Sequence, residues 1–274
     1  MSPIRGQARP VPNPHYIRNR QGSILNLVDT HAHLDLLEGD VAAVLERAYA
    51  VGVTGVVAVG IDLAASRRAV ELAHAFPQVR AVVGMHPHDA SRLDDAALRE
   101  LGRLAADPRV VGIGETGLDF YRDRSPRSDQ ERAFRAQVEL ARGLGLPVVV
   151  HDREAHADTM RILDEYAPFD GRLVMHCFSG DLEMAHAILD MGGYVSVAGP
   201  VTFHNARKLQ DIVRELPTEK LLIETDCPFL SPHPYRGKPN SPERLVLIAE
   251  KVAELKGIPV EDLHLPDPFQ VRAP

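Results

Sequence analysis

Short apolar stretches alternate along the chain with longer stretches in which apolar residues recur every three or four positions. The short stretches are rich in β-branched residues and favour strands, whereas the longer ones favour amphipathic helices. Repeated strand–helix units with parallel strands are typical of a TIM-type barrel. We therefore predict an α/β fold, a single-domain (β/α)8 barrel, with an open doubly wound sheet as the alternative. The eight predicted strands are residues 27–29, 55–60, 80–85, 110–115, 147–151, 172–176, 193–199 and 221–225.

The two ends of the chain lie outside this repeating pattern. The first region holds four arginines, four prolines and no acidic residue, and is predicted to be a basic, flexible or loosely packed extension. The last barrel helix is predicted to begin with Ser241 as N-cap and Pro242 at its first position, and to stop at Gly257. The final region is predicted to be irregular, because Pro266 and Pro268 forbid a helix. The predicted regions are residues 1–26, 27–257 and 258–274.

Composition limits the classes of protein that fit. The chain has 274 residues, of which 45% are hydrophobic and 25% charged, as in a globular domain. A net charge of −7 argues against a broad electrostatic footprint on duplex DNA, but it allows a small phosphate-binding pocket. Two cysteines imply no disulfide framework, and neither a membrane span nor a signal peptide is evident. We expect a cytoplasmic monomer without a membrane or protein partner.

Polar residues that can bind a metal end or follow most of the predicted strands. In a parallel barrel these strand ends meet at one mouth, where barrel enzymes place their active sites. Each residue also has a plainer explanation: Glu115 could pair with an arginine, and Asp226 could cap a turn. Together they favour a divalent metal site, because so many buried polar groups would otherwise be costly. The residues concerned are His31, His33, His86, Glu115, His151, His176 and Asp226.

Six of these residues are expected to bind metal, which is too many for one tetrahedral ion. We therefore expect two divalent cations bridged by Glu115, which lies midway round the barrel between the two sides of the mouth. Two such ions can share a hydroxide and stabilise the attacking and leaving oxygens of a displacement at phosphorus. Asp226 could orient or deprotonate the water, so Glu115 and Asp226 are the expected catalytic residues. Mg²⁺, Mn²⁺, Zn²⁺ and Fe²⁺ all suit this mixture of ligands. One side of the mouth holds His31, His33 and Asp226, and the other side holds His151 and His176.

Six motifs occur in a fixed order along the chain: DTHAHLD, GMHPHD, GETGLDFYR, VVVHDRE, HCFSG and ETDCPFL. This set, from about residue 27 to residue 257, resembles the TatD family of metal-dependent deoxyribonucleases, a branch of the amidohydrolase-like barrels. The resemblance implies hydrolysis of phosphodiester bonds, with 3′–5′ exonuclease action on single-stranded DNA or oligonucleotide ends. It also implies one ion held by His31, His33, Glu115 and Asp226, and the other by Glu115, His151 and His176.

Five further residues of these motifs, together with His86, are candidates for substrate contact. Arg153 lies two residues past His151 and could pair with a phosphate oxygen, as could His86. Tyr121 could stack on a base beside a cation that holds a backbone phosphate. The alternative is a solvated loop whose tyrosine packs back on the protein. The candidates are His86, Asp119, Tyr121, Arg122, Arg153 and Ser179.

Ser179 and the two cysteines have weaker signals. Ser179 could line the mouth, or it could cap a helix that begins near Asp181. Cys177 and Cys227 each follow a proposed ligand, and by the pleat of a strand they point away from it. We expect both to be small packed thiols rather than ligands.

Two other functions remain open. The first is a barrel hydrolase of amides, lactones or small phosphoesters, which often uses a carbamylated lysine at the end of the fourth strand, where this chain has Glu115. The second is a metal-binding protein without turnover. The long first region and the proline-containing end both depart from the family pattern, and the latter affects packing against the last barrel helix more than the chemistry.

Overall fold

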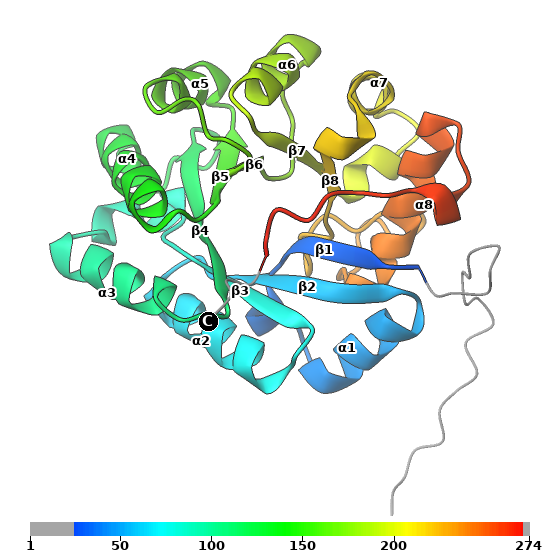
Figure 1. The fold of residues 1–274 in the computed structure, drawn as a ribbon, viewed down its shortest axis with the longest axis horizontal. Coiled ribbons are helices and arrows are strands. Elements are labelled where there is room, and N and C mark those ends of the chain that lie inside the picture. The colour runs from blue at the N-terminus through cyan, green and yellow to red at the C-terminus, as the bar shows by residue number, and fades with distance from the viewer. Residues whose placement is uncertain (1–24, 271–274) are drawn as a thin grey trace, which may run out of the picture.

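The computed structural model describes residues 25–270, and its eight strands form one sheet in chain order. The strands are β1 (Leu27–Ala32), β2 (Val53–Val59), β3 (Val79–Val83), β4 (Val110–Asp119), β5 (Val148–Arg153), β6 (Leu173–Met175), β7 (Tyr194–Val197) and β8 (Leu221–Ile223). The α-helices form a ring outside them (Figure 1): α1 (Val41–Ala50), α2 (Leu63–Ala75), α3 (Asp95–Ala105), α4 (Arg127–Leu144), α5 (His156–Asp164), α6 (Leu182–Asp190), α7 (Arg207–Glu215) and α8 (Leu245–Lys256).

Neighbouring strands are parallel throughout, and β1 and β8 face each other across the remaining seam. Backbone hydrogen bonds close this seam just beyond the end of β8. The N–H of Asp226 donates to the carbonyl of His31 at 2.9 Å, and the N–H of His33 donates to the carbonyl of Cys227 at 2.9 Å. The sheet is therefore a nearly closed barrel. The predicted TIM-type barrel is confirmed, and the open doubly wound sheet is wrong.

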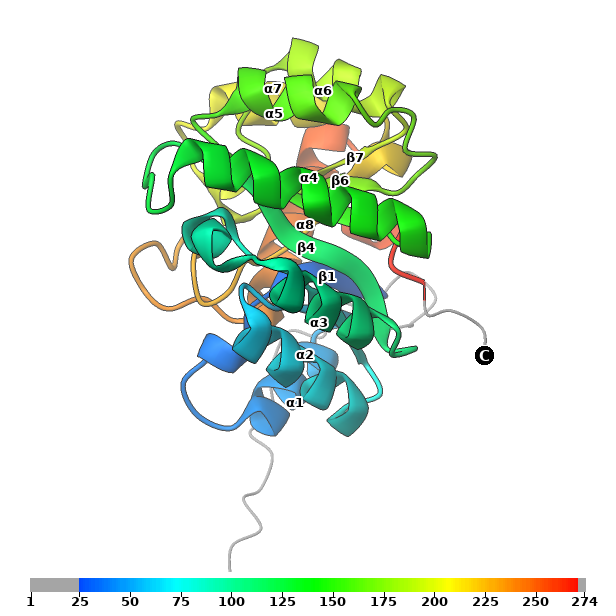
Figure 2. The ribbon, with the colours of Figure 1, turned by 90° about the vertical axis from the view of Figure 1, so that its left-hand side faces the viewer.

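Strand β4 is longer than predicted, and Figure 2 shows it as a long, curved ribbon. It continues to Asp119, so Glu115 lies in the middle of the strand rather than at its end. Gly117 allows this course: its φ is 140°, and a Cβ at this position would overlap the carbonyl oxygen of His151 on β5. Only glycine combines that backbone conformation with so close an approach. The result is that β4 and β5 lie tightly together where Glu115 and His151 meet.

The last barrel helix ends where predicted but begins later. Gly257 follows α8 with a φ of 68°, the left-handed conformation that commonly terminates helices. A 3-10 turn at Pro242–Arg244 precedes the helix, so α8 begins at Leu245. The hydroxyl of Ser241 bonds to the carboxylate of Glu243 and to no backbone N–H. Ser241 thus marks the boundary of the segment without capping it through its side chain.

The proline-containing end has no α-helix, as predicted, yet it is well packed. Residues 260–262 form a single 3-10 turn, and Phe269 is fully buried within a cluster of barrel valines. Arg80, near the start of β3, bonds to the carboxylate of Asp267 at 2.6 Å and to the carbonyl of Phe269. This segment closes the end of the barrel opposite the mouth. In Figure 2 it lies on the side away from the loop that follows β8.

The first described residues already belong to the core. Leu25 is buried, and a Cβ at Gly52 would collide with it, so packing begins before residue 27. The remainder of the predicted extension, residues 1–24, lies outside the described residues. Within residues 25–270, no helix is long and apolar enough to cross a membrane.

Candidate metal centre at the barrel mouth

Glu115 lies among five histidines that come from four strands or from the residues that follow them. Its side chain is 3% exposed, and within residues 25–270 its ion-pair partners are all histidines, so the arginine pairing considered above does not occur. The two carboxylate oxygens divide these histidines into two groups. Oε2 faces Nε2 of His31 at 3.3 Å and of His33 at 3.8 Å. Oε1 faces Nδ1 of His151 at 2.6 Å and Nε2 of His86 and His176 at 3.5 Å each.

Asp226 joins the first of these groups. Its Oδ1 lies 3.3 Å from Nε2 of His33 and 4.0 Å from Nε2 of both His31 and His176. Its backbone has a φ of 54°, and its carbonyl accepts a hydrogen bond from Phe229, so Asp226 does begin a turn. The carboxylate nevertheless faces the histidines rather than capping that turn. The structure thus brings all six predicted metal ligands together.

Partners outside the cluster orient two of the histidine rings. Nδ1 of His33 lies 3.1 Å from the carbonyl of Val59, which can only accept, so Nδ1 donates and Nε2 is left to face Asp226. Nδ1 of His176 lies at an ion-pair distance of 2.9 Å from Oε1 of Glu224, without the geometry of a hydrogen bond, and its Nε2 faces Glu115. Contacts of this kind commonly fix the rings of metal-binding histidines.

Buried nitrogens without partners fit a metal ion. Among residues 25–270, neither ring nitrogen of His31 has a hydrogen-bond partner, and its ring stacks on that of His176 with centroids 3.6 Å apart. Leaving buried polar atoms unpaired costs free energy, which a bound cation would recover. The donor set of imidazoles and carboxylates suits several divalent metals. In the described part of the chain, three groups have ligand atoms within 4.8 Å of one another: His31, His33 and Asp226; His31, His176 and Glu224; and His86, Glu115 and His151.

Within the centre, the pKa of Glu115 is lowered, whereas the pKa values of two histidines are raised. Burial raises the pKa of Glu115, but the charges of nearby histidines, His176 first, hold it well below its usual range. Burial lowers the pKa of His151, but hydrogen bonds to Asp119 and Glu115 raise it to about 9. Burial likewise lowers the pKa of His176, but the charge of Glu224 raises it to about 10. Protonated imidazoles therefore balance the carboxylates, a role that a divalent cation would take over.

His86 differs from the other histidines in its tautomer. Its Nδ1 accepts a hydrogen bond from the backbone N–H of His88 at 3.1 Å, so in the neutral ring Nε2 carries the proton. Burial lowers the pKa of His86 to about 4, which keeps the ring neutral. Its Nε2–H can therefore donate to Glu115 or to a substrate oxygen, whereas a metal ligand would need a free lone pair there.

The loop after β4 carries an exposed aromatic ring flanked by two cations. Tyr121 is 58% exposed, with the guanidinium of Arg153 at 4.0 Å from its ring centroid and that of Arg122 at 5.5 Å. Asp119, by contrast, is buried, and its Oδ2 lies 2.9 Å from Nε2 of His88 and 3.3 Å from Nε2 of His151. The structure places Asp119 behind His151, where it orients the ring, and leaves the other three residues free to reach a ligand.

Ser179 lies on the wall of a cavity of about 290 Å³ between the loops that follow β6 and β7. It does not cap α6, because Asp181 does so by accepting a hydrogen bond from the N–H of Met184 at 2.9 Å. Cys177 lies on the same wall and is only partly buried. Cys177 lies beyond the end of β6 at Met175, so the alternation of side chains along a strand does not determine which way it points. Cys227 is buried in the core, as expected.

Four residues of the site were not predicted from the sequence. His88 repeats the spacing of His31 and His33 within GMHPHD, a signal that could have found it. Glu224 was visible as an acid in an apolar strand, as was Asp29, which accepts hydrogen bonds from Thr225 at 2.6 and 2.8 Å. Phe229 is 52% exposed, and its ring lies edge-on to His33 with centroids 5.9 Å apart. A single phenylalanine in a loop gives no such signal.

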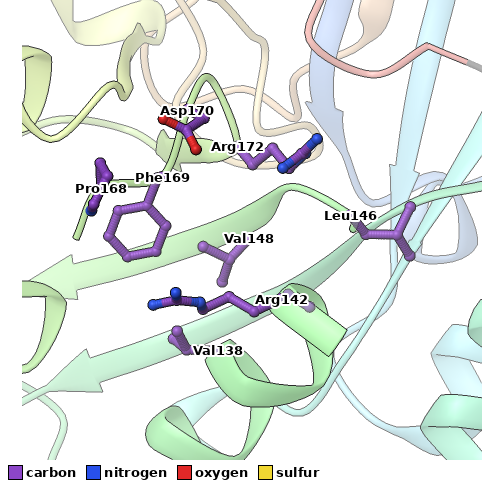
Figure 3. Close-up of a pocket in the computed structure, with 9 residues that line it drawn as sticks. Val138, Arg142, Leu146, Val148, Pro168, Phe169, Asp170 and Arg172 are labelled. Atoms are coloured by element: carbon purple, nitrogen blue, oxygen red, sulfur yellow. The ribbon is translucent and has the colours of Figure 1, made fainter. Parts of the chain in front are cut away.

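A second cavity, of about 190 Å³, lies at the other end of the barrel. Figure 3 shows Arg142 of α4, Val148 of β5 and Phe169 from the segment before β6 around it. Val148 is the first residue of β5, so this cavity is near the strand starts, away from the histidines. This cavity is therefore not part of the candidate metal centre at the mouth.

Comparisons with known proteins agree with this geometry. The model of the family described as TatD related DNase matches residues 28–265. The uncharacterized metal-dependent hydrolase YabD of Bacillus subtilis is 43% identical over 86% of this chain and 94% of that protein. The 3′-5′ ssDNA/RNA exonuclease TatD of Salmonella typhimurium is 37% identical over 78% and 84%. The crystal structure of YjjV, a TatD homologue from Escherichia coli K12, has a TM-score of 0.80 with 30% identity over 86% and 93%. The chain therefore belongs to the TatD related DNase family, a family of metal-dependent hydrolases.

Proposed function

We propose that this protein hydrolyses phosphodiester bonds at the 3′ ends of single-stranded nucleic acid, using two divalent metal ions at the barrel mouth. One observation carries the proposal: the two oxygens of Glu115 face separate groups of histidines, as a bridging carboxylate would. The exonuclease named among the relatives supports the choice of substrate. When bound, such ions lower the pKa of a water molecule and neutralise charge on phosphate oxygens.

The residues around this centre divide the remaining tasks. Asp226 lies at the edge of the cluster and is 8% exposed, so its carboxylate can orient a water and take its proton. His86 holds a proton at Nε2 and can donate it in a hydrogen bond to a phosphate oxygen. Arg153 can pair with a second oxygen, while Tyr121 offers an exposed ring for a base.

A barrel hydrolase of amides, lactones or small phosphoesters is the alternative. Such enzymes often bridge their metals with a carbamylated lysine from the fourth strand, and this chain has Glu115 on β4 instead. A protein that binds metal without turnover is the remaining alternative. Both alternatives predict that the protein leaves single-stranded nucleic acid intact.

The decisive experiment uses a 5′-labelled single-stranded oligonucleotide and purified protein loaded in turn with Mg²⁺, Mn²⁺, Zn²⁺ or Fe²⁺. A ladder of strands shortened from the 3′ end, abolished by EDTA and by Glu115→Ala or Asp226→Ala, is expected. Glu100→Ala is the matched control, because Glu100 is a surface residue paired with Arg67 and Arg103. If folded, metal-loaded protein leaves every strand intact, the proposal fails, and amides, lactones and small phosphoesters become the substrates to screen.

A further inference from the structure

The cavity of about 290 Å³ beside the metal centre has no assigned role. It lies between the loop after β6 and the loop after β7, with Cys177 and Ala198 on its wall. Cys177 directly follows His176, whose Nε2 is 3.5 Å from Glu115. The wall of the cavity thus begins one residue along the chain from the candidate metal centre. Its volume is just below the roughly 300–1,000 Å³ that small-molecule sites occupy.

The inner wall and the rim of this cavity differ in chemistry. Phe178, Pro200 and Leu209 give it apolar faces, and Phe178 is itself 5% exposed. Asn205 and Lys208 stand at the rim on the exposed side. Within residues 25–270, neither of these two side chains has a protein hydrogen-bond or ion-pair partner. Such a site suits a flat apolar ring with a polar edge and a negative charge nearby.

We propose that this cavity binds the nucleoside of the 3′-terminal nucleotide, so that its 5′-phosphate reaches the metal centre. The base would pack against Phe178 and Leu209, its polar edge would face Asn205 and Ser179, and Lys208 would attract the phosphates. This inference rests on the proposed function. A cavity of this volume has room for about one nucleoside, which fits an enzyme that acts on strand ends.

A pair of chromogenic substrates tests the proposal in full-length, metal-loaded protein. Thymidine 5′-(4-nitrophenyl) phosphate carries the nucleoside, whereas methyl 4-nitrophenyl phosphate lacks it. In both, water adds to phosphorus and the bond to nitrophenolate breaks. Ala206→Phe places a ring into the cavity, because Ala206 lines it. Arg207→Gln is the matched control, since Arg207 follows Ala206 as the first residue of α7 and is not part of the cavity wall.

The expected result is a higher kcat/KM for the thymidine substrate than for the methyl substrate. Ala206→Phe should lower the ratio of the two values about tenfold or more, in line with the effect of one lost apolar contact. Arg207→Gln should leave the ratio unchanged. If wild type and Ala206→Phe show the same ratio, the cavity does not bind the nucleoside, although the phosphodiesterase proposal stands.

Direct binding keeps the test independent of turnover. If wild type hydrolyses neither chromogenic substrate, the oligonucleotide assay still decides the proposed function, and calorimetric binding of thymidine 5′-monophosphate decides the inference. Binding that Ala206→Phe removes supports it, and absent or unaltered binding overturns it. If Ala206→Phe does not fold by circular dichroism, Asn205→Ala and Lys208→Gln replace it with the same expected outcomes.

Discussion

Nδ1 of His176 lies 2.9 Å from Oε1 of Glu224, and both side chains are buried. Glu224 is held in turn by the N–H of Cys177 at 2.6 Å and the hydroxyl of Ser196 at 2.7 Å. Its position is therefore fixed independently of His176. This carboxylate acts on the metal centre through the orientation of one imidazole.

We expect Glu224→Gln to weaken metal binding by about 10–100-fold, because an amide orients and polarises the imidazole less than a carboxylate does. Competition titrations with a chromogenic chelator measure the affinity. Glu183→Gln, at an exposed position of α6, is the matched control and should bind metal as wild type does. Equal affinities for Glu224→Gln and wild type would show that Glu224 only fills space.

Metal binding is expected to strengthen as the pH rises. His151 and His176, with pKa values raised to about 9 and about 10, carry protons at neutral pH when no metal is bound. Imidazole ligands must be neutral, so the apparent affinity should rise about tenfold per pH unit for each proton displaced, from about pH 6 to pH 8. Calorimetry in buffers of different ionisation enthalpy counts these protons. A release of none at pH 7 would contradict the raised pKa values.

Removing the exposed ring of Tyr121 should weaken binding of single-stranded nucleic acid. Stacking of a base on an aromatic ring contributes about 1–3 kcal/mol, so Tyr121→Ala should raise Kd roughly 5- to 150-fold. Tyr49→Ala is the control, because Tyr49 is 54% exposed on α1, close to the exposure of Tyr121. Fluorescence anisotropy with a labelled oligonucleotide measures both. The stacking role is lost if the two variants bind alike.

The fold should depend on a residue far from the mouth. Phe269 is fully buried, so Phe269→Ala should lower the free energy of unfolding by about 3–5 kcal/mol. Phe229→Ala, at a half-exposed position, should change it by about 0.5 kcal/mol or less. Urea denaturation of the metal-free proteins gives both values. A small effect of Phe269→Ala would mean that the end segment is dispensable for stability.

The barrel could be predicted from the sequence because its signal is repeated eight times. Each strand is a short apolar stretch, and each helix has its own amphipathic pattern, so an error in one element does not change the fold. The ends of the individual strands and helices are less well determined by the sequence. The apolar pattern predicts a strand over residues 110–115, whereas β4 runs to Asp119, and several histidines make the burial of Glu115 possible.

The candidate ligands could be predicted because the strand order of a barrel brings them to one mouth. What the sequence does not contain is how each side chain is held. Glu224 and Asp119 are single acids whose partners, His176 and His151, are distant in the chain. The packing of Phe269 is also a long-range effect, since prolines exclude a helix but say nothing about burial.

The buried position of Phe269 has a consequence for the order in which the molecule forms. It belongs to one cluster with Val57, Val82 and Val149, which the ribosome makes long before it. One end of the barrel interior is therefore left uncovered until residue 269 has been synthesised. Contacts between residues so far apart form slowly, and the unfinished valine-lined interior is exposed meanwhile. The barrel should reach its native packing only after Phe269 has left the ribosome.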